Sequence, residues 1–336
     1  MQIQSNFSLK PYNTFGIDAR ARYFSTFSDI EELKELTIHY SPFTTFILGG
    51  GSNILFTKDF DGHVLKNDIR GIAKINEDEE YVYVKVGAGE NWHQFVLFCI
   101  QNNWQGIENL SLIPGNVGAS PMQNIGAYGV EIKEVFVGLT AFSLREKSIQ
   151  KFDLASCEFG YRESVFKRKY KNQFVILDVT YRLNKVPNYN TTYGALEKEL
   201  ERMKVNKPGI ATISQAIINI RTSKLPDPAV IGNAGSFFKN PSVSKERFND
   251  LKEEFQNIVG YENSDGTVKL AAGWLIEQCG WKGFRRRDAG CYEKQALVLV
   301  NYGRATGSEI YDLSEEIRQS VIKKFGVELE REVNTV

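Results

Sequence analysis

The pattern of apolar and polar residues predicts strands and helices that follow one another along the whole chain. Residues 81–86 alternate strictly between valine on one face and Tyr or Lys on the other, which is typical of a half-buried strand. Residues 28–40 and 308–325 instead repeat apolar side chains three or four positions apart, which predicts amphipathic helices. Further strands are expected within 44–56, where a glycine loop interrupts the run, and at 135–142, 174–183, 295–301 and 327–333, and further helices at 91–102, 214–220 and 270–280.

The order of these elements favours an α+β fold, because strands and helices interleave without a strict βαβ rhythm. The polar, turn-rich residues 185–195 are expected to form a loop. Two prolines shortly after residue 221 place the best internal boundary within 221–242. A length of 336 residues predicts two or three domains.

Composition excludes several classes of partner. Lys and Arg total 41, as do Asp and Glu, so the formal net charge is zero and general binding of nucleic acid or anionic membranes is not expected. The chain shows no secretory signal and no run of about 18 apolar residues that could span a membrane. Four scattered cysteines without a CxxC pair favour a reducing, cytoplasmic compartment, and three dispersed histidines indicate no metal site. The balanced charge, without an apolar surface stripe, favours a monomer.

Two glycine-rich stretches are the strongest candidates for ligand binding. Residues 48–53 place three glycines, Ser52 and Asn53 directly after an apolar strand, and such a backbone can wrap a pyrophosphate closely. Alone, this stretch fits a tight hairpin turn equally well. Residues 114–129 add several glycines beside amides and a hydroxyl, which indicates a backbone that approaches a ligand. Neither GxGxxG nor GxxxxGK[ST] occurs in these stretches, so a Rossmann or P-loop site is not expected.

The stretches resemble the flavin-binding domain of the vanillyl-alcohol oxidase and p-cresol methylhydroxylase superfamily, and more closely the family of UDP-N-acetylenolpyruvoylglucosamine reductases. The similar segments occur in one order over nearly the whole chain: SLKPYNTFGIDARA (8–21), LGGGSNIL (48–55), VGAGENWH (86–93), IPGNVGASPMQNIGAYGVE (113–131), FGYRESVFK (159–167), RTSKLPDP (221–228), GNAGSFFKNP (232–241), KLAAGWLIEQCG (269–280) and QALVLVN (295–301). The segment TYGAL (192–196) resembles the tyrosine-bearing loop of the family's first subtype, which closes over substrate.

The resemblance implies a non-Rossmann, two-part FAD-binding module followed by a C-terminal α+β substrate domain. It implies residues 1–70 with 327–336 as the first FAD-binding part, 71–222 as the second part and 223–326 as the substrate domain. The implied reaction reduces the enolpyruvyl ether of UDP-N-acetylenolpyruvoylglucosamine to UDP-N-acetylmuramate, in peptidoglycan precursor synthesis, with non-covalent FAD and with NADPH as co-substrate. The implied FAD-binding residues are Gly49, Gly50, Gly51, Ser52, Asn53, Gly115, Gly118, Ser120, Asn124, Gly126 and Arg221.

The same resemblance implies a catalytic trio of Arg162, Ser236 and Glu332. Reduction places negative charge beside the substrate carboxylate, and a guanidinium with a planar donor fork is suited to hold it. Ser236 would then supply the proton. The family pattern Leu-x-Pro-Glu-Val aligns Glu332, but Arg331 replaces the proline and the chain ends three residues after Val333, so Glu330 is kept as an alternative. The implied substrate contacts are Tyr193, Lys224, Asn240 and Gln295.

Two other functions are compatible with the sequence. One is a different oxidase or dehydrogenase of the same flavin superfamily, in which a histidine sometimes carries the flavin covalently. The histidines lie outside the glycine stretches, and only His93 comes close after a glycine-containing motif. This scarcity of histidines near the predicted site favours dissociable FAD. The other is a nucleotide-sugar binding protein without catalysis. Bleaching of bound flavin by NADPH would distinguish the reductase from this binding protein.

Overall fold

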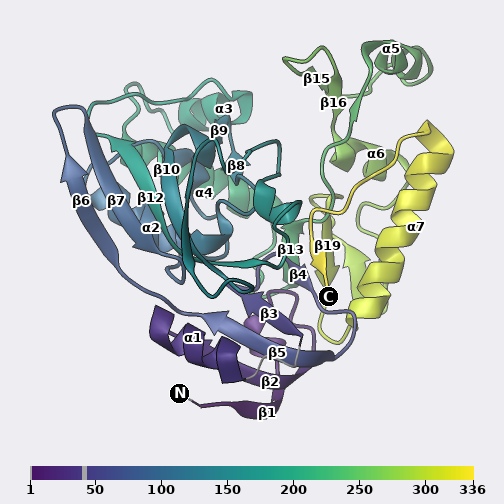
Figure 1. Ribbon diagram of the computed structural model, residues 1–336. Helices are drawn as coiled ribbons and strands as arrows, with labels where there is room; N and C mark the ends of the chain where they lie inside the picture. The colour runs from purple at the N-terminus through teal and green to yellow at the C-terminus, as the bar shows by residue number, and fades with distance from the viewer. Residues whose placement is uncertain (1, 40–43) are drawn as a thin grey trace. The chain divides into compact units, whose positions relative to one another are not determined.

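The computed structural model describes residues 2–39 and 44–336, and its chain divides into two compact units. Unit 1 comprises Met1–Phe7, Ala21–Gly50 and Asp61–Ser223. Unit 2 comprises Ser8–Arg20, Gly51–Phe60 and Lys224–Val336. Helices and strands mix in both units, which confirms the α+β class (Figure 1). Within the described ranges, no helix combines the length and apolarity needed to cross a membrane.

Two larger sheets lie in the described residues of unit 1. The first has the order β1-β2-β5-β3, with bounds Gln4–Ser8 (β1), Arg20–Phe27 (β2), Phe60–Asn67 (β5) and Thr45–Leu48 (β3). Helix α1 (Ile30–His39) contributes Leu33 and Leu36 to a buried cluster with Phe27 and Leu65 of this sheet. The expected helix at 28–40 is therefore present, although residue 40 lies outside the described residues.

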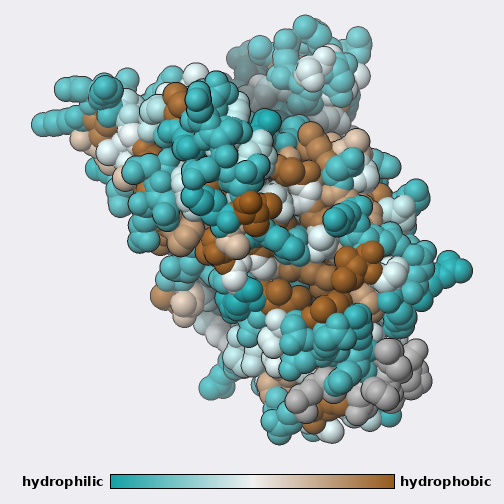
Figure 2. All heavy atoms as spheres, turned by 60° about the vertical axis from the view of Figure 1, so that its left-hand side comes forward, coloured by the Kyte–Doolittle hydropathy of each residue, from teal (hydrophilic) through white to brown (hydrophobic). Residues whose placement is uncertain are grey.

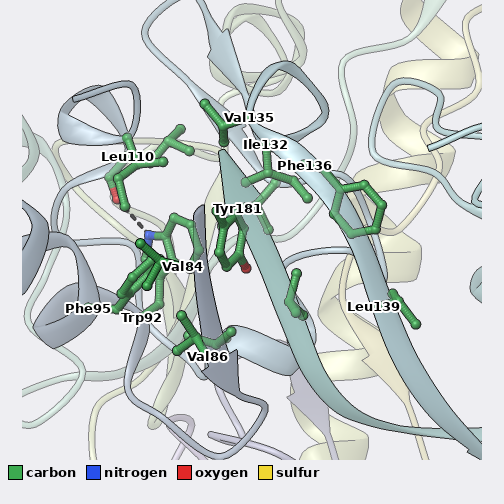
Figure 3. Packing of buried hydrophobic residues seen from close by; sticks show 14 of the residues in the cluster. Val84, Val86, Trp92, Phe95, Leu110, Ile132, Val135, Phe136, Leu139 and Tyr181 are labelled. Atoms are coloured by element: carbon green, nitrogen blue, oxygen red, sulfur yellow. Dashed lines mark hydrogen bonds between the residues drawn. The ribbon is translucent and has the colours of Figure 1, made fainter. Parts of the chain in front are cut away.

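The second sheet of unit 1 forms its main core. Its order is β11-β10-β12-β7-β6, with bounds Ile149–Asp153 (β11), Phe136–Ser143 (β10), Phe174–Asn184 (β12), Tyr81–Gly87 (β7) and Ile72–Glu77 (β6). The valines of β7 point inward with Tyr181 of β12, against Trp92 and Phe95 of α2 (Trp92–Gln101), as Figure 3 shows. The indole nitrogen of Trp92 donates a hydrogen bond to the Leu110 carbonyl at 2.9 Å. The strict alternation at 81–86 is thus explained by one-sided burial.

Smaller elements complete unit 1. The hairpin β8 (Gly126–Ala127) and β9 (Val130–Glu131) occupies the second glycine stretch. Helix α3 (Gly194–Arg202) begins where the predicted loop ends, and α4 covers Ile210–Lys224. The helix expected at 214–220 is longer at both ends, since α4 begins at Ile210 and continues to Lys224. It ends just before Leu225 and Pro226.

Unit 2 is organised around helix α7 (Gly307–Phe325). The order β13-β19-β18-β17 describes its larger sheet, and the smaller ladders are β14-β16-β15 and β20-β4. The strand bounds are Gly232–Ser236 (β13), Val298–Asn301 (β19), Ala289–Cys291 (β18), Arg285–Arg286 (β17), Ser242–Val243 (β14), Val268–Leu270 (β16), Gly260–Glu262 (β15), Ile54–Leu55 (β4) and Asn334–Thr335 (β20). The other helices are α5 (Lys245–Glu254) and α6 (Ala272–Gln278).

Local sequence signals determine α7. Thr306 and Glu309 form a capping box at its start, and Gly326 ends it with a left-handed φ of 62°. Its apolar residues, spaced by three or four, are buried from Ile310 to Phe325. The helix expected at 308–325 is confirmed.

The predicted strand at 327–333 is wrong. Val327, Leu329 and Val333 are buried, while Glu328 is exposed, so the alternation is real. However, the segment forms only an isolated bridge between Arg331 and Phe238, and a two-residue strand follows at Asn334–Thr335. Alternation reports burial on one side of an extended chain, whereas a strand also requires a hydrogen-bonded neighbour.

Figure 2 shows one face of the molecule. Hydrophilic residues cover most of it, and hydrophobic residues reach the surface in several patches between them. Exposed apolar side chains of this kind are ordinary on folded proteins.

Candidate functional site

Unit 1 brings the two glycine stretches into direct contact. A Cβ on Gly50 would lie only 2.7 Å from the Cα of Gly115, and a Cβ on Gly118 would lie 2.7 Å from the Cβ of Ala88. A larger side chain at either place would force the backbones apart. Within unit 1, the backbones of Gly50 and Gly115 therefore meet, although the two residues lie far apart in sequence.

The first stretch divides after Gly50 between the two units. A Cβ on Gly49 would meet nothing within 4 Å, so its surroundings are open. In unit 2, Gly51 has a φ of 65° and packs against the carbonyl of Tyr12, so no side chain fits there. The side-chain amide of Asn53 donates to the carbonyl of Glu332 at 3.3 Å.

Two predicted FAD contacts are engaged inside the protein. The Ser120 hydroxyl and the Tyr181 hydroxyl are buried and 2.7 Å apart. The amide of Asn124 donates to Glu131 and to the carbonyl of Gly160, and its oxygen accepts from the backbone of Lys133. These side chains support the loop, and their role toward FAD stays a prediction.

Arg162 lies against the hairpin of the second stretch. Its guanidinium donates a 2.6 Å hydrogen bond to the carbonyl of Gly126, and a Cβ on Gly126 would lie 3.2 Å from the same guanidinium. Arg162 also has a left-handed φ of 53°, which is uncommon for a residue with a side chain. The fold thus holds this predicted catalytic residue beside the glycine backbone.

A largely buried cation, Arg221, lies in the same part of unit 1. The hydroxyl of Tyr128 interacts electrostatically with its guanidinium, and its Nε is buried without a hydrogen-bond partner. Burial lowers the pKa of Arg221; Tyr128 opposes this shift and the nearby Arg162 adds to it. Within the part of the chain that the structure describes, no carboxylate pairs with Arg221. Two neighbouring cations, one of them desolvated, favour an anionic ligand.

Tyr128 is a site residue that the predictions missed. Its ring meets that of Tyr193 edge to face, with centroids 5.4 Å apart. Its place among the glycines at 126–129 was the available sequence signal, and the structure adds a left-handed φ of 50°. Tyr128 links the predicted substrate residue Tyr193 to the predicted cofactor residue Arg221.

His93 lies close to this group. Its Nδ1 accepts a 3.0 Å hydrogen bond from the backbone N–H of Leu112. Burial, followed by the charge of Arg221, lowers the pKa of His93. The ring is therefore held neutral and oriented.

Unit 2 places Ser236 beside Glu332. Ser236 ends β13, and the backbone N–H of Glu332 donates a 2.9 Å hydrogen bond to the carbonyl of Phe237, the next residue. Across residues 2–39 and 44–336, the Ser236 hydroxyl makes no protein hydrogen bond. It is half-buried and available to a ligand.

Glu330, the alternative carboxylate, is engaged elsewhere. Its side chain is 70 % exposed and forms a 2.6 Å ion pair with the buried ammonium group of Lys239. The backbone N–H of Lys239 also donates to the Glu330 carbonyl at 2.8 Å. The carboxylate of Glu330 is therefore already engaged in an ion pair.

The predicted substrate residues of unit 2 have different surroundings. Asn240 and Gln295 both lie near the start of α6: Asn240 accepts from the N–H of Ala272, and the Gln295 oxygen would lie 2.9 Å from a Cβ on Gly273. Lys224 is exposed at the end of α4.

The residues of unit 1 fit the FAD that the resemblance implies. FAD offers an anionic pyrophosphate and a flat ring system. Because the glycines carry no side chain, a ligand can approach their backbone closely, and the space at Gly49 is open. The Nε of Arg221 lacks a hydrogen-bond partner. The described residues contain no group of three or more His, Cys, Asp or Glu placed to hold a metal ion.

A cavity of about 340 Å³ lies elsewhere in unit 2. It is lined by the start of α7 and by charged residues of both signs, and by none of the predicted site residues. Its charged residues are Lys10, Asp18, Lys58, Asp59 and Arg304.

Comparisons with known proteins agree with these features. A family model described as an FAD binding domain matches residues 30–146, and one described as the C-terminal domain of UDP-N-acetylenolpyruvoylglucosamine reductase matches residues 227–336. The crystal structure of UDP-N-acetylenolpyruvylglucosamine reductase (MurB) from Thermus caldophilus has the same fold, with a TM-score of 0.71 at 21 % identity over 100 % of this chain and 99 % of that chain.

Curated relatives cover the full chain. Those from Flavobacterium johnsoniae and Amoebophilus asiaticus are each 50 % identical over 100 % of both chains, and one from Pseudomonas fluorescens is 47 % identical over 99 % of both. All three are named UDP-N-acetylenolpyruvoylglucosamine reductase. This chain therefore belongs to the family of UDP-N-acetylenolpyruvoylglucosamine reductases.

Proposed function

We propose that the chain catalyses the NADPH-dependent, FAD-mediated reduction of UDP-N-acetylenolpyruvoylglucosamine to UDP-N-acetylmuramate. The observation that carries this proposal is the 50 % identity, over both full chains, to relatives of that name. It favours the reductase over another flavin oxidase and over a binding protein without catalysis.

Unit 1 supplies groups that suit the cofactor. The backbone at Gly49, Gly50 and Gly115 would receive the pyrophosphate, and Arg221 would offer its unpartnered Nε to an anionic or carbonyl oxygen. Bound FAD would supply the redox chemistry, the transfer of a hydride equivalent from NADPH to the enolpyruvyl double bond. The remaining predicted FAD contacts belong to this proposal as well.

The catalytic side chains would manage charge and proton on the substrate. As a C–H bond forms at the terminal carbon and the π bond breaks, negative charge spreads over the adjacent carbon and its carboxylate. Arg162, held by the Gly126 carbonyl, would stabilise this charge. Ser236 would transfer its hydroxyl proton to the adjacent carbon, forming the second C–H bond.

Glu332 would assist beside Ser236. Its backbone N–H donates a hydrogen bond to the carbonyl of Phe237, so the fold of unit 2 sets its position relative to Ser236. A protonated carboxyl there would donate a hydrogen bond without adding a second anion to the enolate. For substrate binding, we assign Tyr193 and Lys224 to the pyrophosphate and Asn240 and Gln295 to further polar contacts.

Half-reactions of Ser236→Ala test the proposal. Reduction of bound flavin by NADPH should stay nearly intact, because the serine acts only on the substrate, while reoxidation by the enolpyruvyl UDP-sugar should slow by about 10²–10³-fold. Stopped-flow absorbance of the flavin measures both steps, with Ser242→Ala as a control elsewhere in unit 2. An equal fall in both steps would make Ser236 structural. A wild-type flavin that NADPH does not bleach, or that substrate does not restore, would contradict the reductase function itself.

The cofactor should be dissociable. The Nδ1 of His93 is occupied by the Leu112 backbone, which argues against flavin attachment at that atom. Acid precipitation should release all flavin into the supernatant, and flavin retained in the pellet would contradict this. We further propose that the protein is a cytoplasmic monomer, in keeping with its four free thiols and balanced charge.

A further inference from the structure

The loop that leads to Tyr193 is fastened to the rest of unit 1 at several points. The backbone N–H of Asn188 donates to the side-chain oxygen of buried Gln105 at 3.3 Å. Two residues later, the carbonyl of Asn190 accepts a 2.8 Å hydrogen bond from the amide of Asn109, which is itself buried. Tyr193 is the N-cap residue directly before α3, which lies beside the hairpin of β8 and β9 (Figure 1).

Asn190 makes the central connection of this loop. Its amide nitrogen donates a 2.9 Å hydrogen bond to the carbonyl of Gly129, and its oxygen accepts from the hydroxyl of Thr192 at 3.1 Å. A Cβ on Gly129 would lie 3.2 Å from this amide nitrogen, and the φ of Gly129 is 82°. The turn is therefore built for close approach of Asn190.

The same turn carries Tyr128, whose backbone carbonyl accepts the second hydrogen bond of the Asn109 amide at 2.9 Å. Asn190 and Asn109 thus hold the loop and the turn together, at the point where Tyr128 and Tyr193 meet edge to face. Tyr193 itself is 48 % exposed. Without this connection, an exposed ring at the end of a loop would sample many positions, and ordering it on binding would cost conformational entropy.

We propose that Asn190 is a positioning residue for substrate binding, which holds Tyr193 where it meets the UDP-sugar by fastening its loop to the turn at Gly129. The inference rests on the proposed role of Tyr193. Asn190 acts through Tyr193 and is not itself a substrate contact.

The loop offers a matched control. Asn188 is the same residue type two positions earlier, and its side chain makes no hydrogen bond within the described ranges, only its backbone does. Asn190→Ala removes three side-chain hydrogen bonds, of which only the one to Gly129 joins the loop to the turn. It should raise the Kd of the enolpyruvyl UDP-sugar and its KM by about 3- to 10-fold. Flavin reduction by NADPH and kcat should change little. Asn188→Ala should behave as wild type.

Two further variants separate the bonds of Asn190. Asn190→Asp keeps the acceptor for Thr192 but places an oxygen against the Gly129 carbonyl, so it should weaken binding at least as much as Asn190→Ala. Thr192→Val removes only the hydroxyl hydrogen bond within the loop and should change the Kd less than Asn190→Ala. Substrate-induced changes in the flavin absorption spectrum give each Kd.

A double-mutant cycle with Tyr193→Ala decides whether Asn190 acts through Tyr193. Once Tyr193 is removed, Asn190→Ala should add less than about a twofold further rise in Kd. A full additional rise, or equal behaviour of Asn190→Ala and Asn188→Ala, would overturn the inference. If Tyr193→Ala alone left the Kd unchanged, the proposed contact of Tyr193 would fail instead, so the two failures are distinguishable.

Discussion

Single residues with similar sequence surroundings have different environments in this protein. Glu330 and Glu332 lie two positions apart in a segment that alternates apolar and charged side chains. Glu330 pairs with the buried Lys239, whereas the backbone of Glu332 is bonded next to Ser236. Two residues of the same type therefore differ in their environments, and the proposed catalytic role of Glu332 depends on that difference.

Glutamine substitutions test this assignment. Glu332→Gln should slow flavin reoxidation by substrate by about 10²-fold or more, the usual contribution of one positioned acid–base group. Glu330→Gln should leave that rate near wild type and lower the Tm, because it weakens the ion pair with Lys239. Stopped-flow reoxidation and thermal unfolding of both variants provide the comparison. A slow Glu330→Gln beside a normal Glu332→Gln would reverse the assignment.

His63 makes the stability of unit 1 depend on pH. It is buried, its Nε2 lies 3.0 Å from the Ser25 hydroxyl, and burial lowers its pKa from 6.5 to about 4. Between these values the unfolded chain binds a proton that the folded chain does not, so stability is full above pH 6.5 and falls toward pH 4. The loss is on the order of 3 kcal/mol.

The test compares wild type with His63→Asn by urea unfolding between pH 5 and pH 7. Over this range the variant should lose less stability, because it has no group to protonate at this site. Glu315, whose pKa is lowered to about 2, loses its contribution only below the range. The lowered pKa of His93 adds a smaller slope of the same sign. An unchanged slope in His63→Asn would contradict the prediction.

At the scale of elements, glycines with similar sequence surroundings serve different purposes. Gly51 has a left-handed φ and is packed against the Tyr12 carbonyl, whereas Gly49 faces open space. The first is therefore required by the turn itself. The second is not required by packing, and we propose that a ligand approaches its backbone closely.

Alanine substitutions separate these purposes. Gly51→Ala should lower the free energy of unfolding of the apoprotein by more than about 1 kcal/mol, because its backbone conformation and its neighbour both exclude a side chain. Gly49→Ala should change that stability by less than about 1 kcal/mol but weaken FAD binding. Urea unfolding and quenching of flavin fluorescence measure the two effects. Tight FAD binding by Gly49→Ala would argue against a cofactor at this glycine.

The same scale shows which elements local sequence predicts well. Helix α7 was predicted almost to its ends, because its cap, its apolar repeat and its terminal glycine all lie within the helix or next to it. The short strands β14–β18 were not predicted, since strands of two or three residues depend on hydrogen-bonding partners elsewhere in the chain. The helix α5 was not predicted either. The candidate site shows the same division: the glycines were recognisable as a motif, whereas Tyr128 became a candidate only through its proximity to Arg221 and its ring contact with Tyr193.

At the scale of the whole molecule, the chain contributes three separate segments to each unit. Unit 2 uses the early residue Phe15, whose ring contacts Phe237 and whose carbonyl accepts a hydrogen bond from Asn301 at 2.9 Å. It also uses β4 as the partner of β20. The C-terminal third of the chain therefore lacks part of its own core.

Fragments test this consequence. A fragment of residues 224–336 should remain without a cooperative unfolding transition, because it lacks residues 8–20 and 51–60. A fragment of residues 1–223 contains every segment of unit 1 and should unfold cooperatively. Circular dichroism in urea and the dispersion of amide NMR signals distinguish the outcomes. Cooperative folding of residues 224–336 alone would show that the early segments are dispensable.

The sequence by itself determined the α+β class, the long helices, the two glycine stretches and the family, because caps, periodicity and motifs are written in neighbouring residues. Only the tertiary structure decided that Gly50 and Gly115 touch, that the Nε of Arg221 is buried without a hydrogen-bond partner, and that Glu332 rather than Glu330 lies beside Ser236. The physical reason is that burial, close approach and pairing are properties of residues far apart in the chain. No local pattern encodes them.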